Sequence, residues 1–178
     1  DRASLEGAFV GIDAVVQLAA LDMGVQAPEA DFFRVNVQGL WNVLEFAETA
    51  KVKRTVVCSS LAAVNISRAN PPRYLPVDIH HPAAPVHAYG ISKLAGEVVA
   101  KAFSERSPMQ VFCLRPMLVM RDAAIYGIAR QAALEDGTPP PPAAADPEWA
   151  PSKPRPGSRH FVSTRDVARA FRSALEAD

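Results

Sequence analysis

The sequence lacks an excess of charge of either sign, and this argues against two classes of partner. Its 178 residues contain 19 lysines and arginines against 19 aspartates and glutamates, so the formal net charge is zero. Proteins that bind nucleic acid or an anionic membrane through their surface normally carry a clear basic excess. We therefore expect neither nucleic acid nor a membrane as the partner of this chain.

Long apolar runs and cysteines are also scarce. No run approaches the roughly 20 apolar residues of a membrane-spanning helix, and no charged-then-apolar secretory leader opens the chain. Cys58 and Cys113 lie within apolar, strand-like runs, which indicates buried free thiols in a reducing compartment rather than a disulfide. We expect a cytoplasmic protein. Because the first residue is Asp1 and not methionine, we also expect a piece of a longer chain.

Three short apolar runs predict the strands of a parallel sheet. They cover 13–20, 54–59 and 110–115 and lack the polar alternation of strands with one solvent-facing side. Between them, apolar residues recur at helical spacing: Val37, Leu40, Trp41, Leu44 and Ala47, then Leu94, Val98, Ala102 and Phe103. The order strand–helix–strand–helix–strand predicts an α/β fold with right-handed crossovers and helices on both faces of the sheet.

The last third of the chain differs in composition. Eight of the 18 residues from 139 to 156 are proline, which excludes a helix or a central strand there. We interpret this segment as an extended surface loop, with a substrate-facing loop as the alternative. The chain ends in a predicted helix whose N-cap is Ser163, three residues before Asp166.

Small and polar residues gather where the predicted strands end. The first strand ends in the small stretch 18–20 and the second in Ser59 and Ser60, while Tyr89 and Lys93 begin the helix that leads to the third. Ligands of an open parallel sheet bind at the carboxyl ends of its strands. A separation of four residues places Tyr89 and Lys93 on one face of a helix. The sequence thus predicts a site at this edge.

Tyrosine, lysine and serine together can exchange a proton with a hydroxyl or carbonyl compound. A free phenol titrates near pH ~10, too high for a good general base at neutral pH, and a neighbouring ammonium lowers its pKa. A serine hydroxyl can hold the same substrate oxygen. None of the three moves electrons, so this chemistry requires a cofactor that accepts or supplies a hydride.

Six stretches, in this order, resemble an extended short-chain dehydrogenase/reductase of the NAD-dependent epimerase/dehydratase family. They are 11–20, 36–39, 54–60, Tyr89-Gly-Ile-Ser-Lys-Leu-Ala-Gly-Glu97, Leu114-Arg-Pro116 and 161–168. The resemblance implies a Rossmann-like doubly wound parallel sheet, with 1–116 a partial NAD(P)-binding domain and 117–178 a partial substrate-binding region. It also implies an NAD(P)-dependent oxidoreductase, epimerase or dehydratase. The substrate would be sugar-like, nucleotide sugars being the commonest family ligands, or another small hydroxyl or carbonyl compound.

The resemblance also implies roles for individual residues. Tyr89 would be the catalytic acid/base, Lys93 would lower its pKa and bind the nicotinamide ribose, and Ser60 would be the catalytic hydroxyl. Other family members place that hydroxyl one residue later, where this chain has Leu61. Contacts with NAD or NADP are implied for Leu18, Ala19, Ala20, Leu21, Asn36, Ser59, Tyr89, Lys93 and Met117.

Two further expectations concern metals and partners. His80, His81 and His87 have no carboxylate or cysteine at ligand spacing, so we interpret them as solvated loop residues and expect no metal. The resemblance implies a possible homodimer through the helices that contain Asn36 and Tyr89.

Two features depart from the family. The phosphate-binding pattern Gly-x-x-Gly-x-x-Gly is absent from the nine glycines. We therefore expect that the residues that hold the pyrophosphate and choose between NAD and NADP lie outside this chain, which alone would bind dinucleotide weakly and be inactive. The stretch 117–122 replaces an Asn-Val-Tyr-Gly-Pro-like turn, which leaves the substrate open. The alternative function is a non-catalytic member, a cofactor-sensing or protein-binding module.

Overall fold

The computed structural model describes residues 2–137, 139 and 161–177 and divides the chain into two compact units. The first is Asp1–Arg115 with Ser173–Asp178, and the second is Pro116–Arg172. This division differs from the predicted 1–116 and 117–178 at Pro116, which belongs to the second unit, and at 173–178, which belongs to the first. The cofactor-binding and substrate-binding roles of the two parts stay predictions.

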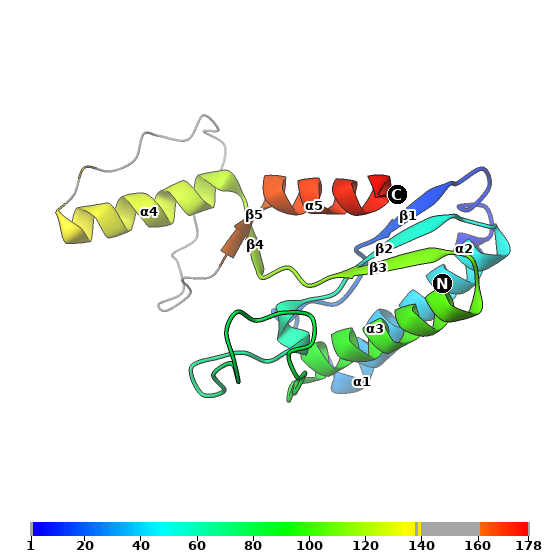
Figure 1. The fold of residues 1–178 in the computed structure, drawn as a ribbon, viewed down its shortest axis with the longest axis horizontal. Helices are drawn as coiled ribbons and strands as arrows, with labels where there is room; N and C mark the ends of the chain where they lie inside the picture. Colours follow the sequence, from blue (N-terminus) through cyan, green and yellow to red (C-terminus); the bar gives the residue numbers. More distant parts are fainter. Residues whose placement is uncertain (1, 138, 140–160, 178) are drawn as a thin grey trace. The chain divides into compact units, whose positions relative to one another are not determined.

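The first unit contains a parallel sheet with the strand order β1-β2-β3 (Figure 1). Its strands are β1 (Ala14–Gln17), β2 (Arg54–Cys58) and β3 (Gln110–Leu114), within the three predicted runs. Val16 pairs with Val56, which pairs with Phe112. β2 is the central and most buried strand, whereas β1 alternates between exposed and half-buried residues. Complete cover on both faces, predicted for all three strands, therefore holds for β2 alone.

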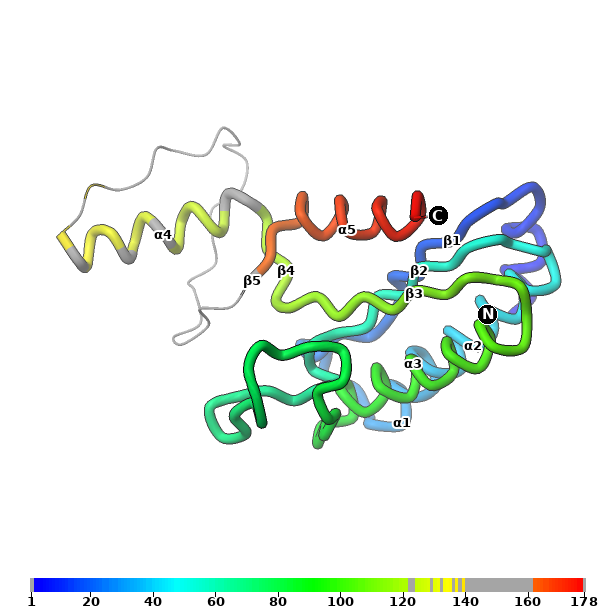
Figure 2. The backbone as a smooth tube through the Cα atoms, in the orientation of Figure 1, coloured from blue at the N-terminus to red at the C-terminus, as the bar shows by residue number. Residues whose placement is uncertain are grey.

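Helices connect the strands in both crossovers. The first crossover is α1 (Glu29–Phe32), the π-helical turn η2 (Phe33–Gln38) and α2 (Gly39–Thr49), and the second contains the short η3 (Leu61–Ala63) and α3 (Ala88–Arg106). A further short turn, η1 (Ala3–Leu5), precedes β1. α2 and α3 lie side by side on one face of the sheet (Figures 1 and 2). Both crossovers step in the same direction across the sheet, so right-handed connections bring both helices to one face.

The opposite face of β2 meets the end of the chain. Successive residues of a strand point to opposite faces, so Arg54 lies on the face away from Val57, which packs under the helices. The Arg54 guanidinium donates a hydrogen bond to the backbone carbonyl of Leu175. Leu175 belongs to the last turn of α5 (Thr164–Glu176), the part of that helix within the first unit.

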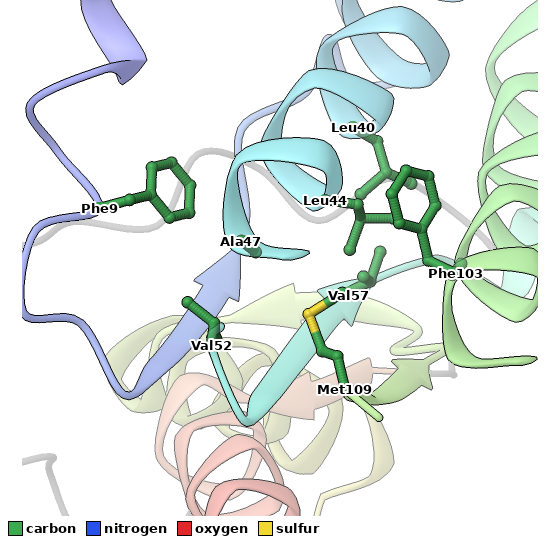
Figure 3. Packing of buried hydrophobic residues seen from close by; sticks show 9 residues of the cluster. Phe9, Leu40, Leu44, Ala47, Val52, Val57, Phe103 and Met109 are labelled. Atoms are coloured by element: carbon green, nitrogen blue, oxygen red, sulfur yellow. The ribbon is translucent and has the colours of Figure 1, made fainter. Parts of the chain in front are cut away.

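The core of the first unit lies between the two helices and the sheet. Figure 3 shows Phe103 of α3 meeting Leu40 and Leu44 of α2, with Val57 and Met109 close by. Leu44 and Phe103 have no exposed surface, and burial of such a side chain contributes on the order of 1.5–3 kcal/mol. The other members of this cluster are Phe9, Ala47, Val52 and Ala100. Of the residues in the two predicted helical stripes, Leu40, Leu44, Ala47 and Phe103 lie in this core. Trp41 and Val98 are 40% and 65% exposed, and Ala102 is exposed as well, so the prediction is wrong for these three.

The second unit pairs two short strands and carries two helices. β4 (Leu118–Met120) and β5 (Phe161–Ser163) are parallel, and α4 (Asp122–Asp136) and α5 follow them in sequence. The Ser163 hydroxyl accepts a hydrogen bond from the Asp166 backbone N–H at 3.0 Å, which confirms the predicted N-cap. All of the proline-rich segment except residue 139 lies outside the described residues. In the described part of the chain, we find no helix with the length and apolar character needed to cross a membrane.

Candidate active site

The site forms where the end of β2 meets the first turns of α3. Ser60 follows β2 in an extended conformation, and its Oγ accepts a hydrogen bond from the Ala62 N–H at 3.1 Å, which starts the η3 turn. Lys93 reaches back from α3, and its Nζ donates to the backbone carbonyl of Cys58 at 2.8 Å. The strand end and the helix are therefore joined at the predicted edge of the sheet.

The three predicted catalytic side chains lie together at this junction. The Lys93 Nζ is 5.7 Å from the centroid of the Tyr89 ring, as expected for residues on one helix face. The Ser60 side chain lies close enough to Tyr89 to lower the pKa of its phenol. The Tyr89 ring also packs edge-on against Phe32, with centroids 6.4 Å apart. The structure thus brings together a phenol, an ammonium and a hydroxyl from two separate elements.

Burial dominates the electrostatics of this trio. It raises the pKa of the Tyr89 phenol, the interaction with the Ser60 side chain lowers that pKa, and charge on Cys58 and Asp22 would raise it. Burial also lowers the pKa of the Lys93 ammonium. The net shift of the Tyr89 pKa is therefore upward. The lowering of this pKa by Lys93 stays a prediction; in this geometry the ammonium is also engaged by the Cys58 carbonyl.

Asn36 ties the end of β1 to α3. Its side-chain oxygen accepts from the Leu21 N–H at 2.7 Å, and its amide nitrogen donates to the Leu21 carbonyl at 3.0 Å and to the Ser92 Oγ at 2.9 Å. The Ser92 hydroxyl donates in turn to the Tyr89 carbonyl at 2.7 Å. Asn36 lies in the π-helical turn η2, and such turns often mark functional sites.

A small pocket opens beside this network. Among its lining residues are four of the predicted cofactor contacts, namely Ala19, Asn36, Ser59 and Lys93. Leu18, Ala20, Leu21 and Tyr89 lie outside its lining; Leu18 is 61% exposed at the end of β1. Met117, the last predicted contact, belongs to the second unit. The role of each of these residues in cofactor binding stays a prediction.

Ser59 makes contacts that the sequence did not indicate. Its Oγ donates to the Glu97 carboxylate at 2.5 Å, and its N–H donates to the Leu114 carbonyl at 2.8 Å. Glu97 also accepts two hydrogen bonds from the Arg115 guanidinium, at 2.8 and 2.6 Å, and this contact raises the pKa of Arg115. Glu97 follows Lys93 by four residues, so helical spacing could have placed it on the same face.

One of the three histidines of this loop is buried, contrary to the prediction. His81 is only 7% exposed, its Nε2 accepts from the Arg73 N–H at 3.0 Å, and its ring packs 5.1 Å from Tyr74. The interpretation of His81 as a solvated residue is therefore wrong, because these backbone and ring contacts bury it. His80 and His87 are exposed. Within the described ranges, no group of three or more His, Cys, Asp or Glu residues could hold a metal ion.

Comparison with known proteins gives consistent matches. The model of the NAD dependent epimerase/dehydratase family matches residues 1–122. The chain is 33% identical over 127 residues to the N-acetyl-alpha-D-glucosaminyl-diphospho-ditrans,octacis-undecaprenol 4-epimerase of Escherichia coli O157:H7, a match that covers 71% of the chain and 35% of that protein. It is 33% identical over 123 residues to an L-arabinose 1-dehydrogenase (NAD(P)(+)) of Haloferax volcanii, covering 65% of the chain and 48% of the relative.

The solved structures give the same result for the fold. The NAD complex of the Bordetella bronchiseptica enzyme WbmG matches with a TM-score of 0.66 and 26% identity, over 99% of this chain and 51% of that one. The predicted Rossmann-like fold with a parallel sheet is confirmed. The chain spans about a third to a half of the length of the relatives named here.

Proposed function

The chain belongs to the NAD-dependent epimerase/dehydratase family, and from this premise we propose that the whole protein is an NAD(P)-dependent oxidoreductase, epimerase or dehydratase. The observation that carries the proposal is the meeting of Ser60, Tyr89 and Lys93 at the end of β2. A sugar-like substrate is supported by the names of the curated relatives, a glucosaminyl-diphospho-undecaprenol 4-epimerase and an L-arabinose dehydrogenase.

Tyr89 handles the proton in this proposal. Because its pKa is raised, the phenol is protonated at neutral pH, and it first donates its proton to a substrate carbonyl oxygen. The Ser60 hydroxyl holds that same oxygen as charge develops on it. The Lys93 ammonium, 5.7 Å from the ring centroid, favours the phenolate that forms. In the oxidative direction the phenolate takes the proton of the substrate hydroxyl.

The pocket beside Lys93 has room for about one water molecule, so a nicotinamide ring and its ribose would lie at its mouth, against the side chains that line it. The small side chain of Ala19 permits close approach to the backbone, while the Lys93 ammonium supplies a hydrogen-bond donor. Asn36 uses its amide on Leu21 and Ser92, so it holds the wall of the pocket. The bound nicotinamide would accept or supply the hydride.

Replacement of Tyr89 by Phe in the full-length protein tests this function. We expect turnover to fall by about 10²–10⁴-fold, the usual contribution of a positioned acid/base group, while the affinity for NAD or NADP stays within about twofold. The assay follows nicotinamide reduction with L-arabinose and a uronate, and sugar inversion with UDP-glucuronic acid. Tyr74→Phe, on a tyrosine outside the site that is 40% exposed, is the matched control.

Two outcomes would contradict the proposal. Unchanged turnover in Tyr89→Phe would refute the acid/base role. A wild-type protein that binds the dinucleotide but turns over no substrate in a wider sugar panel would favour the alternative, a cofactor-sensing or protein-binding module.

We keep the homodimer through α2 and α3 as a proposal as well, supported by the exposed apolar residues Trp41, Ile91 and Val98 on these helices.

A further inference from the structure

We propose that Gly90 is a positioning residue whose missing side chain sets the separation of the Ser60 hydroxyl and the Tyr89 phenol. The inference rests on the proposed function, because it concerns the geometry of the same catalytic pair. Glycine is among the poorest helix formers, and Gly90 nevertheless occupies the first turn of α3. Its presence there requires a reason other than helix formation.

The reason is a close approach between two backbones. A Cβ atom at Gly90 would lie 2.5 Å from the carbonyl oxygen of Ala62 and 3.1 Å from the Cβ of Pro85. The first distance is well inside van der Waals contact, and the atom concerned belongs to the main chain, so no side-chain rotation can relieve the overlap. Any side chain at Gly90 must push α3 and the η3 turn apart.

The η3 turn carries Ser60 with it. The Ser60 Oγ accepts from the Ala62 N–H at 3.1 Å, and the Ser60 carbonyl accepts from the Ala63 N–H at 3.0 Å. Displacement of Ala62 therefore moves Ser60, which is only two residues away. Gly90 itself directly follows Tyr89, so the overlap separates the Ser60 hydroxyl from the Tyr89 phenol.

The helix side of the contact is held in place by other bonds. The Lys93 ammonium is bound to the Cys58 carbonyl and the Ser92 hydroxyl to Asn36, whereas the hydrogen bonds that form the η3 turn are local ones within 60–65. We therefore expect the turn, and not the helix, to give way. A longer Ser60–Tyr89 distance weakens the interaction that lowers the pKa of the phenol.

The test compares Gly90→Ala with Gly39→Ala in the full-length protein. Gly39 also lies in a helix, and a Cβ there meets no atom within 4 Å, so both variants gain the same helix propensity and only the first creates the overlap. We expect Gly90→Ala to lose about 10–100-fold in kcat, with cofactor affinity unchanged, and Gly39→Ala to keep wild-type activity. The pH at which Tyr89 titrates should rise in Gly90→Ala, measured by phenolate absorbance against the same variant carrying Tyr89→Phe.

A double variant separates positioning from a general loss of structure. If Gly90 acts through Ser60, Ser60→Ala/Gly90→Ala should be no worse than Ser60→Ala alone, because interacting sites are not additive. Losses that multiply, an unshifted Tyr89 titration, or loss of the helical circular dichroism in Gly90→Ala would each overturn the inference. If Ser60→Ala impairs turnover but Gly90→Ala does not, only the positioning role fails. If Ser60→Ala keeps full turnover, the role of Ser60 in the proposed function fails with it.

Discussion

The two halves of α3 contact the rest of the first unit in different ways. In the first half the buried residues are small or polar, as Gly90, Ser92 and Gly96 show, and the helix meets the backbone of the η3 turn. In the second half Ala100 and Phe103 enter an apolar core. Close approach of backbones leaves room for polar groups at the strand ends, whereas large apolar side chains fill the space between helix and sheet. One helix therefore serves a site at one end and a core at the other.

The comparison makes a prediction about what substitutions in each half change. Changes in the first half should affect proton transfer more than the free energy of unfolding, because they alter distances between polar groups. Changes in the second half should lower the free energy of unfolding and leave the chemistry of the folded protein intact. The substitutions below test this difference.

The largest stability effect is expected from Phe103→Ala in the second half. Phe103 has no exposed surface, and its ring contacts Trp41 at 5.1 Å between centroids. Its truncation should lower the free energy of unfolding by about 3–5 kcal/mol, measured by urea denaturation, while kcat of the folded fraction stays unchanged. Val98→Ala, at a residue of α3 that is 65% exposed, should stay within about 0.5 kcal/mol. A large fall in kcat with little loss of stability would contradict the division of the helix.

A smaller effect is expected at the middle of the helix, where Glu97 pairs with Arg115. The two side chains are 13% and 26% exposed, so Glu97→Gln leaves the Arg115 charge poorly paired at a cost of about 2 kcal/mol, below that of a fully buried pair. Urea denaturation measures this loss. Glu105→Gln breaks the pair of Glu105 and Lys101, whose side chains are 63% and 70% exposed respectively. This change should lower the free energy of unfolding by less than about 0.5 kcal/mol. Equal losses at the two pairs would show that burial does not decide their strength.

The sequence predicted those features of α3 and the sheet that depend on local pattern. The runs around Val56 and Cys113 are continuous because the strands are covered or paired, and the spacing of Tyr89 and Lys93 follows from the helix period. Features that depend on distant neighbours were not predictable. The Ser59 hydroxyl donates a hydrogen bond to Glu97, 38 residues further along the chain, and no local sequence pattern predicts this contact.

The same limit applies to burial and to the charge states it controls. Burial raises the pKa of Tyr89, whose ring packs against Phe32 from the preceding crossover. The ring of His81 is buried against Tyr74 in a segment where the sequence shows only a loop. The π-helical turn at Phe33–Gln38 was not predicted either, since its hydrogen bonds join residues five apart instead of four and no pattern of apolar residues marks this difference.

The free energy of unfolding should depend on pH through the Cys113 thiol, which packs against the core. Burial raises the pKa of this thiol from 9.0 to about 12 in the folded protein. The charge on Glu97, in the first half of α3, also raises the pKa of this thiol. Between pH 9.0 and about 12, the thiol therefore loses its proton in the unfolded chain but keeps it in the folded one. Stability is therefore retained below pH ~9 and lost above it, by up to about 1.4 kcal/mol per pH unit. Urea denaturation of Cys113→Ser from pH 7 to 10.5 should give a shallower alkaline decline than wild type. Parallel curves would contradict the assignment.

The smallest effect is expected at Gly39, a helical glycine outside the close approach at Gly90. Its substitution tests whether every glycine in a helix of this chain is required. Its φ and ψ of −61° and −44° are ordinary helical values, and a Cβ there meets no atom within 4 Å. Gly39→Ala should therefore raise the free energy of unfolding by about 0.5–1 kcal/mol, because alanine loses less backbone entropy on folding. Thermal denaturation beside Gly90→Ala measures both changes. A gain at Gly39 with a loss at Gly90 would show that small size matters only where two backbones touch, and destabilisation of both variants would refute that distinction.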